Sequence, residues 1–248
     1  MKLWCSSGNV TLYQGDALDL PESIRAQAFV TDPPYSRAGA AHTGRSSVAG
    51  KAEEAGGSDQ FWLYWFKDVA RLLCERTERC GFVFCDYRTI HLVERAFAMS
   101  KTGWAVTQAL IWDRESMGLG SPFRAGHEMI AFVRSPDFVW DGPRDVRNVL
   151  SYRWPYGKHE HHAAEKPTDL LGYLISLTTK PTETVLDLFA GSGSTLVAAA
   201  ERGRRVVGVE MEEEHCVTAA RRIQRVVLAP ACGPTETPAL QRQGDLFG

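Results

Sequence analysis

The stretch TVLDLFAGSGST, residues 184–195, carries the clearest structural signal in the chain. Its first half is apolar and predicts a buried strand, and the helical pattern Leu196–Arg202 follows the glycines. Glycines at such a turn let the backbone approach a ligand closely, and the free N–H groups at the start of the helix favour an anionic or carboxylate group. This strand, turn and helix predict a cofactor site at the carboxyl end of a strand in an α/β sheet.

The next predicted strand, Arg205–Glu210, ends in a carboxylate, which is well placed for the hydroxyls of a ribose. A dinucleotide-binding loop is the main alternative. Its third glycine would fall at Leu196, and the acid Asp187 at the end of the preceding strand would repel a pyrophosphate. A cationic cofactor fits these residues better. A plain strand-to-helix turn is the other interpretation.

Short apolar runs alternate with amphipathic helical patterns along the chain, which predicts an α/β protein with a mostly parallel sheet. The run Met129–Arg134 follows Thr107–Trp112 through a glycine-rich connection without a helical pattern, so we expect an antiparallel strand closing one edge of the sheet. The other predicted strands are Val10–Gln14, Ala28–Thr31, Gly81–Cys85 and Thr184–Phe189, and the other predicted helices are Phe61–Cys74, Leu170–Leu177 and Cys216–Val227.

A second chemical element, Asp32-Pro33-Pro34-Tyr35, follows the apolar run Ala28–Thr31. The two prolines fix the backbone and remove two N–H donors, so that rigid carbonyls, a carboxylate and an aromatic ring project from the end of the strand. Such a group can accept hydrogen bonds from an amino group and stack on a planar ring. A simple turn is the structural alternative, but the position at a strand end favours a ligand site.

Together, Asp32–Tyr35 and Asp187–Thr195 resemble the catalytic and cofactor motifs of the S-adenosylmethionine-dependent DNA amino-methyltransferases, which methylate adenine N6 or cytosine N4. The catalytic motif comes first here, an order that resembles the permuted β group of that family. The resemblance implies a Rossmann-like class I methyltransferase domain over residues 1–228, with S-adenosylmethionine as cofactor and double-stranded DNA as substrate. We expect residues 10–135 to form its catalytic half, residues 136–161 a small target-recognition segment, and residues 162–228 its cofactor half.

Three further segments agree with the family pattern. Gln14–Leu18 lies where the family places a Gly-Asp loop at the cofactor's adenine, Gly126–Ile130 resembles the His-Glu segment before the last strand, and His162–Pro167 resembles the motif that closes over the cofactor's methionine end. The cofactor-binding residues that the resemblance implies are Asp16, Ala17, Asp32, His162, Lys166, Pro167, Asp187, Phe189, Gly191, Ser192, Gly193, Ser194, Thr195, Glu210 and Met211.

The chemistry of an exocyclic amine explains why these residue types are needed. Its lone pair is delocalised into the ring, so the amine is a poor nucleophile. Hydrogen bonds to the Asp32 carboxylate and the Pro33 carbonyl would favour a pyramidal nitrogen and offset the positive charge that develops during attack on the sulfonium methyl. The target base must leave the duplex stack, and Tyr35 offers it an aromatic face. The predicted catalytic residues are Asp32, Pro33, Pro34 and Tyr35.

The first residue of the catalytic motif bears on the choice of base. In the family this residue is usually Asp for adenine and Ser for cytosine, so Asp32 favours adenine N6. Cytosine N4 methylation is the nearest alternative, followed by RNA methylation and by a catalytically silent DNA-binding protein. The sequence contains no nuclease or helicase pattern, so we expect a stand-alone modifier, either an orphan enzyme or part of a restriction-modification system.

Aromatic side chains such as Trp140 and Tyr152 interleave with basic ones in Pro136–Glu165, a pattern typical of nucleic-acid contact. A packed surface subdomain with solvated charges is the alternative. The Gly-, Ala- and Ser-rich stretch Ser36–Gln60 has no apolar periodicity and is interpreted as a lid or a disordered segment. The predicted DNA contacts are Arg37, Arg114, Arg124, Arg144, Arg147, Arg153, Trp154 and Lys158.

The composition is that of an ordinary globular protein, with 44% apolar and 23% charged residues. The 28 Lys and Arg residues against 30 Asp and Glu residues give a net charge of −2, so DNA must be held by a local basic face, with modest and salt-sensitive nonspecific affinity. The sequence has no signal-peptide or membrane-span pattern, and its six cysteines lack framework spacing. We therefore expect a cytoplasmic protein with reduced thiols.

Two short segments carry separate hypotheses. His159–His162 could be a metal cluster, but its spacing suits neither a helix face nor a zinc knuckle, so no metal is expected. The tail, residues 229–248, lacks periodicity and is expected to be disordered. Its segment Gln243–Phe247 resembles the short peptide by which bacterial replication proteins dock on the sliding clamp. The family resemblance and the short recognition segment also make a homodimer an expectation.

Overall fold

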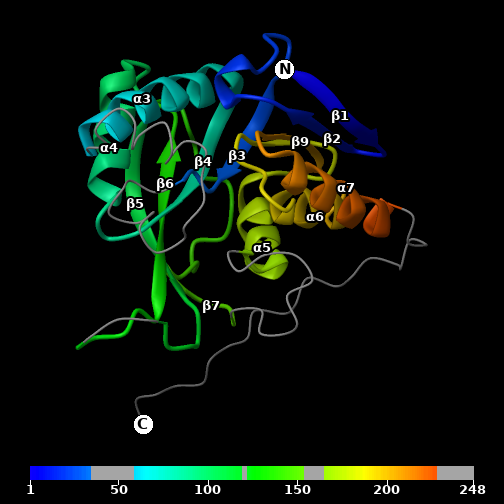
Figure 1. Cartoon of the computed structure of the whole chain (residues 1–248). Helices are drawn as coiled ribbons and strands as arrows, with labels where there is room; N and C mark the ends of the chain where they lie inside the picture. The colour runs from blue at the N-terminus through cyan, green and yellow to red at the C-terminus, as the bar shows by residue number, and fades with distance from the viewer. Residues whose placement is uncertain (35–58, 119–121, 154–164, 228–248) are drawn as a thin grey trace.

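A single mixed β-sheet forms the centre of the protein (Figure 1). The computed structural model describes residues 1–34, 59–118, 122–153 and 165–227. Within these residues the strands are ordered β1-β2-β9-β8-β3-β4-β6-β5-β7. Their bounds are β1 (Lys2–Ser7), β2 (Val10–Gln14), β3 (Ala26–Thr31), β4 (Thr77–Cys85), β5 (Ala105–Asp113), β6 (His127–Arg134), β7 (Val149–Ser151), β8 (Thr184–Asp187) and β9 (Arg205–Glu210).

Helices cover both faces of the sheet, which gives three layers (Figure 1). On one face, Phe66 and Phe97 of the helices pack in a core with Phe29 of β3. On the other face, Leu174 and Ile223 of the helices belong to a second core. No helix among the described residues is long and apolar enough to cross a membrane. The first face carries α3 (Asp59–Arg76) and α4 (Ile90–Ser100), and the second carries α5 (Thr168–Thr178), α6 (Ser194–Glu201) and α7 (Glu213–Val227).

The antiparallel strands lie at two places in the sheet. Strand β6, which contains the run Met129–Arg134, is antiparallel to its neighbours as predicted. It was expected at an edge but lies between β4 and β5, because β5 pairs with its outer side and β7 then pairs in parallel with β5. The antiparallel edge strand of the sheet is instead β1, which pairs with β2.

The two halves of the chain meet in the middle of the sheet. Strand β3 precedes β8 by most of the chain, yet the two are parallel neighbours, with Ala28 opposite Val185 and Phe29 opposite Leu186. The catalytic motif follows β3 and the glycine turn follows β8. The two motifs therefore lie side by side in the fold, although the catalytic motif comes first in the chain.

The cysteines that the structure describes are free thiols, as expected. Burial raises the pKa of Cys74, Cys80 and Cys85 to about 12, so these side chains stay protonated and act as apolar core residues.

Candidate active site

Four neighbouring parallel strands have their carboxyl ends on the same side of the sheet. An acidic residue is the last residue of each strand or follows it closely. Strands β2, β9, β8 and β3 lie side by side in parallel. Their carboxyl ends lead to Asp16, Glu210, Asp187 and Asp32, respectively. Ligands of open α/β sheets bind at this edge. The topology therefore gathers these predicted site residues, which are far apart in the sequence, along one edge.

The glycine turn after β8 has the backbone geometry that only glycine adopts easily. Gly191 has φ of 52° and Gly193 has φ of 85°, both in the left-handed region. A Cβ atom on Gly193 would lie 2.9 Å from the Cβ of Ala219 in α7, so a side chain there meets a packed helix. Helix α6 begins directly after it, at Ser194. Gly193 therefore lets the turn pack against α7, whereas a Cβ on Gly191 would meet nothing within 4 Å, so the backbone is open there.

Glu210 holds the glycine turn from the end of β9. Its Oε2 accepts a hydrogen bond of 2.7 Å from the N–H of Gly191, and its Oε1 accepts one of 2.8 Å from the N–H of Glu212. The Nδ1 atom of His215 lies 3.6 Å from Oε1. Burial alone would raise the pKa of Glu210, but the hydrogen bonds and the neighbouring His215 outweigh it and lower the pKa. Glu210 is therefore an ionised, fixed carboxylate.

Asp187 is buried beneath the turn. Its Oδ1 accepts hydrogen bonds of 3.0 Å from the Thr31 hydroxyl and 3.0 Å from the N–H of Phe189. Burial raises the pKa of Asp187 to about 7, although hydrogen bonds from Phe189, Thr195 and Thr31 oppose this rise. A nearby positive charge would return the carboxyl group to its ionised form, so this position suits a cationic ligand.

The Asp32 motif is fixed by contacts from both faces. The indole N–H of Trp62 in α3 donates a hydrogen bond of 2.6 Å to the carbonyl of Pro34, and Pro33 is buried. The Nζ of Lys166, which precedes α5, lies 2.8 Å from Oδ2 of Asp32. Asp32 itself is partly exposed toward the edge of the sheet. Its carboxylate is thus held on a rigid backbone, paired with Lys166 and still partly exposed.

Lys166 connects this carboxylate with a second one. Its Nζ lies 3.2 Å from Oε2 of Glu128 and 5.2 Å from the centre of the Phe84 ring. Burial on its own lowers the pKa of Lys166, but the charges of Asp32 and Glu128 and their hydrogen bonds more than compensate, and the pKa is raised. Lys166 is therefore a buried cation at the active-site edge.

One pocket joins the two motifs. It brings Asp32, the predicted catalytic acid, together with the predicted cofactor residues of the glycine turn, although Asp32 and the turn lie in different halves of the chain. Tyr35 and His162 lie outside the described residues, so their roles stay predictions. The pocket is lined by Thr31, Asp32, Phe84, Glu165, Lys166, Leu171, Asp187, Phe189, Ala190, Gly191, Ser192, Ser194 and Thr195.

Comparison with known proteins agrees with this geometry. The family model of a DNA methylase, N6_N4_Mtase, matches residues 26–221. The chain belongs to this DNA methylase family. It is therefore a DNA methyltransferase.

Individual relatives are distant. YubD of Escherichia coli (strain K12) is 26% identical over 216 residues, which is 86% of this chain and 89% of YubD. Among solved structures, the M1.HpyAVI–SAM complex is 22% identical with a TM-score of 0.66, over 86% of this chain and 98% of that chain. The PvuII cytosine-N4-specific DNA methyltransferase is 18% identical with a TM-score of 0.68, over 92% and 94% of the two chains. At these identities the two structures establish the fold.

The methyltransferase contains two positioning residues that the sequence pattern did not single out. Arg222 of α7 donates hydrogen bonds to the carbonyl and hydroxyl oxygens of Ser192 and to the hydroxyl oxygen of Ser194, and it forms an ion pair with Glu165. Trp62 holds Pro34, as described above. Neither residue belongs to a motif. Each lies on a helix whose amphipathic pattern is explained by packing alone, so no separate sequence signal marks it.

The other predicted cofactor residues that the structure describes are not among the residues that line the pocket. They are Asp16, Ala17, Pro167, Gly193, Glu210 and Met211. Asp16 accepts a hydrogen bond of 3.0 Å from the N–H of Leu18 and so caps a short 3₁₀ helix, η1 (Ala17–Asp19), and Ala17 is buried. Met211 directly follows Glu210, and Pro167 precedes α5 as its N-cap. The pocket lining does not include these residues, so their cofactor contacts stay predictions.

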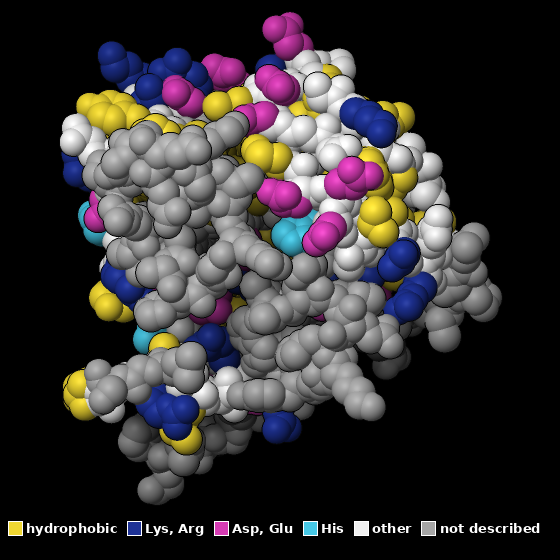
Figure 2. All heavy atoms as spheres, in the orientation of Figure 1, with side chains coloured by type: hydrophobic (Ala, Val, Ile, Leu, Met, Phe, Trp, Pro, Cys, Tyr) yellow, Lys and Arg dark blue, Asp and Glu magenta, His cyan; other side chains and the backbone are white. Residues whose placement is uncertain are grey.

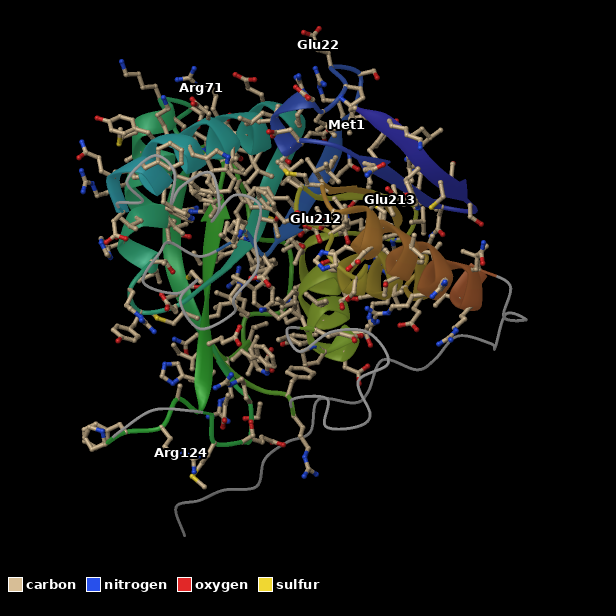
Figure 3. All side chains as sticks on the ribbon, in the orientation of Figure 1. Met1, Glu22, Arg71, Arg124, Glu212 and Glu213 are labelled. Carbon is tan, nitrogen blue, oxygen red and sulfur yellow. The ribbon has the colours of Figure 1, made fainter. Side chains whose placement is uncertain are left out.

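The predicted DNA contacts fall into two structural groups. Arg124, Arg144, Arg147 and Arg153 are exposed, whereas Arg114 is largely buried, 3.5 Å from Glu128, and donates a hydrogen bond of 2.6 Å to the carbonyl of Ala125. Arg124 lies in the connection between β5 and β6, and Figure 3 shows it away from the rest of the sheet. The predicted contacts outside the described residues are Arg37, Trp154 and Lys158.

Two aromatic residues of the predicted recognition segment have a structural role. Trp140 and Tyr152 are partly buried and pack against the core that includes α5. Tyr152 also accepts, through its carbonyl, a hydrogen bond of 2.7 Å from the indole of Trp112. For these two side chains the structure agrees with the interpretation as a packed surface subdomain.

Charge is unevenly distributed over the face shown in Figure 2. Most acidic side chains lie in the upper half of this view, together with several Lys and Arg, whereas the described charged side chains of the lower half are mainly Lys and Arg. The labelled Glu212 and Glu213 lie near the start of α7 in Figure 3, far from Arg124. A net charge of −2 is therefore compatible with a local basic region.

The metal and clamp hypotheses concern other parts of the chain. His159–His162 and Gln243–Phe247 both lie outside the described residues. The absence of a metal at the first segment and the docking of the second on a sliding clamp stay predictions, as does the homodimer.

Proposed function

We propose that the protein transfers a methyl group from S-adenosylmethionine to N6 of adenine in double-stranded DNA. The observation that carries the proposal is the position of the Asp32 carboxylate at the end of β3, in the same pocket as the glycine turn after β8. A planar amine and a methyl donor that meet in this pocket would be held together by elements of a rigid sheet. Such positioning supplies much of the rate in a transfer between two bound molecules.

The residues present fit this cofactor. Glu210 is an ionised carboxylate at a strand end, where it can accept hydrogen bonds from ribose hydroxyls. Asp187 is a buried acid for which a nearby cation is favourable. The N–H groups at the start of α6 suit the carboxylate of an amino-acid group. When bound, S-adenosylmethionine supplies an electrophilic methyl on a sulfonium centre.

The catalytic work of the chain is then assigned to the Asp32 motif. The Asp32 carboxylate and the Pro33 carbonyl accept hydrogen bonds from the target amine, which makes its nitrogen pyramidal and offsets the positive charge that develops there. Trp62 keeps the backbone of this motif in place through Pro34. The base reaches the pocket by leaving the duplex stack.

Direct sequencing tests the choice of base. DNA from cells that express the protein, read by single-molecule sequencing, is expected to carry N6-methyladenine at one short recognition site. We favour adenine because the motif begins with Asp32 rather than Ser. N4-methylcytosine would instead establish the alternative base. Methylation of RNA alone, or DNA binding without any methylation, would contradict the proposed function.

Cofactor affinity is expected to depend on pH through Asp187. Because burial raises the pKa of Asp187 to about 7, this carboxyl is mostly protonated at pH 6 and mostly ionised at pH 8. The ionised form favours a cationic cofactor, so the affinity for S-adenosylmethionine should rise by up to about tenfold between these pH values. Titration calorimetry across this range measures it. Asp187→Asn should remove the dependence, and an unchanged slope in that variant would contradict the assignment.

A further inference from the structure

The ammonium group of Lys166 lies against the carboxylate that the proposed reaction uses. Its Nζ lies 2.8 Å from the Asp32 carboxylate and 3.2 Å from the Glu128 carboxylate. The side chain of Lys166 is only 10% exposed, and that of Glu128 only 15%. Both carboxylates therefore share one buried cation.

This arrangement creates a competition at Asp32. The proposed reaction requires the Asp32 carboxylate to accept a hydrogen bond from the target amine. An ammonium group at 2.8 Å is a stronger, charged donor and lowers the capacity of that carboxylate to accept from a neutral amine. The carboxylate therefore becomes a stronger acceptor for the amine when Lys166 loosens its contact with Oδ2, provided that this buried cation keeps a partner.

Glu128 is well placed to pair with the ammonium group of Lys166. It lies on β6 in the interior of the sheet, so its backbone is fixed. Its Oε2 is buried and, among the described residues, accepts no hydrogen bond that would compete with Lys166. Its other oxygen, Oε1, faces Arg114 at 3.5 Å, which holds the carboxylate in place from the far side. The centre of the Phe84 ring lies 5.2 Å from Nζ, so the ring also stabilises the cation.

We propose that Glu128 is a positioning residue for methyl transfer. It takes over the Lys166 ammonium when the target amine binds Asp32, so that the catalytic carboxylate is released while the buried cation stays paired. This inference rests on the proposed function and adds to it a residue that acts through Lys166 rather than on the substrate.

Glu128→Gln tests the proposal, because glutamine keeps the shape of the side chain and removes its charge. Lys166 would then remain on Asp32, and the single-turnover rate constant of methyl transfer to unmethylated plasmid DNA should fall by about tenfold to a hundredfold. The Kd for S-adenosylmethionine and the melting temperature should stay close to those of the wild type. The matched control is Glu78→Gln, an exposed position at the start of β4, which should keep the wild-type rate.

The outcomes separate this inference from the proposed function. A Glu128→Gln rate within twofold of the wild type would overturn the inference. So would a fall in rate matched by an equal fall in cofactor affinity or by a large loss of melting temperature, because either result indicates a merely structural role. Wild-type protein that transfers no methyl group to DNA would refute the proposed function itself.

Discussion

Asp32→Ala is expected to reduce methyl transfer by about a thousandfold or more, with cofactor affinity within about threefold of the wild type. Loss of one preorganised group at the reacting centre costs about a hundredfold to a thousandfold in other enzymes. In the proposed reaction the Asp32 carboxylate is the group that accepts hydrogen bonds from the amine. Lys166 stays paired with Glu128 in the variant, so the fold should survive. Incorporation of a labelled methyl group into DNA measures the rate, and calorimetry measures cofactor binding.

A milder substitution serves as the control for this experiment. Asp32→Asn retains the size of the side chain and one oxygen that accepts hydrogen bonds, so it should lose less activity than the alanine variant. Near-normal turnover by Asp32→Ala would refute the mechanism. Loss of cofactor binding in both variants would show instead that Asp32 organises the pocket.

The second large effect is expected at Glu210, which accepts a hydrogen bond from Gly191 in the pocket lining. Glu210→Ala should weaken the binding of S-adenosylmethionine by about a hundredfold or more. The substitution removes the acceptor for the N–H groups of Gly191 and Glu212, so it leaves two backbone donors unsatisfied in the turn as well as removing the proposed contact with the ribose. Equilibrium binding of the cofactor measures the effect.

The neighbouring acid Glu213 provides the comparison. It is exposed in the first turn of α7, so Glu213→Ala removes the same charge without touching the glycine turn. We expect its cofactor affinity to stay within about twofold of the wild type. Equal losses in the two variants would mean that Glu210 acts only through the general negative charge of this region.

The sequence predicted the elements that have strong local signals. Strand β8 with its glycine turn, strand β3 with its prolines, and the acid at the end of β9 were all expected, because flanking Gly and Pro favour a strand over a helix for a short apolar run. The sequence did not single out β1, β7 or α4. Strand β1 is a partly exposed edge without a clear alternation, and β7 has only three residues. Helix α4 is as long as the predicted α5, so its length does not explain why it was missed.

The pairing within the candidate site was not predictable from the motifs. Lys166 was expected at the cofactor, and Glu128 was expected only as part of a His-Glu segment. Their shared contact with Asp32 depends on β6 lying inside the sheet next to β4, whereas the pattern of a glycine-rich hairpin suggested an edge. Long-range pairing of strands of this kind leaves no local trace in the sequence.

The hydrogen bond between Thr31 and Asp187 joins residues 156 positions apart in the chain. During synthesis, the segment that carries Asp32 leaves the ribosome long before β8 and the glycine turn are made. A nascent or truncated chain that stops before β8 therefore has the proposed catalytic acid but lacks the strand and glycine turn of the proposed methyl-donor site. Chains that stop before the late half should therefore bind no methyl donor and transfer no methyl group.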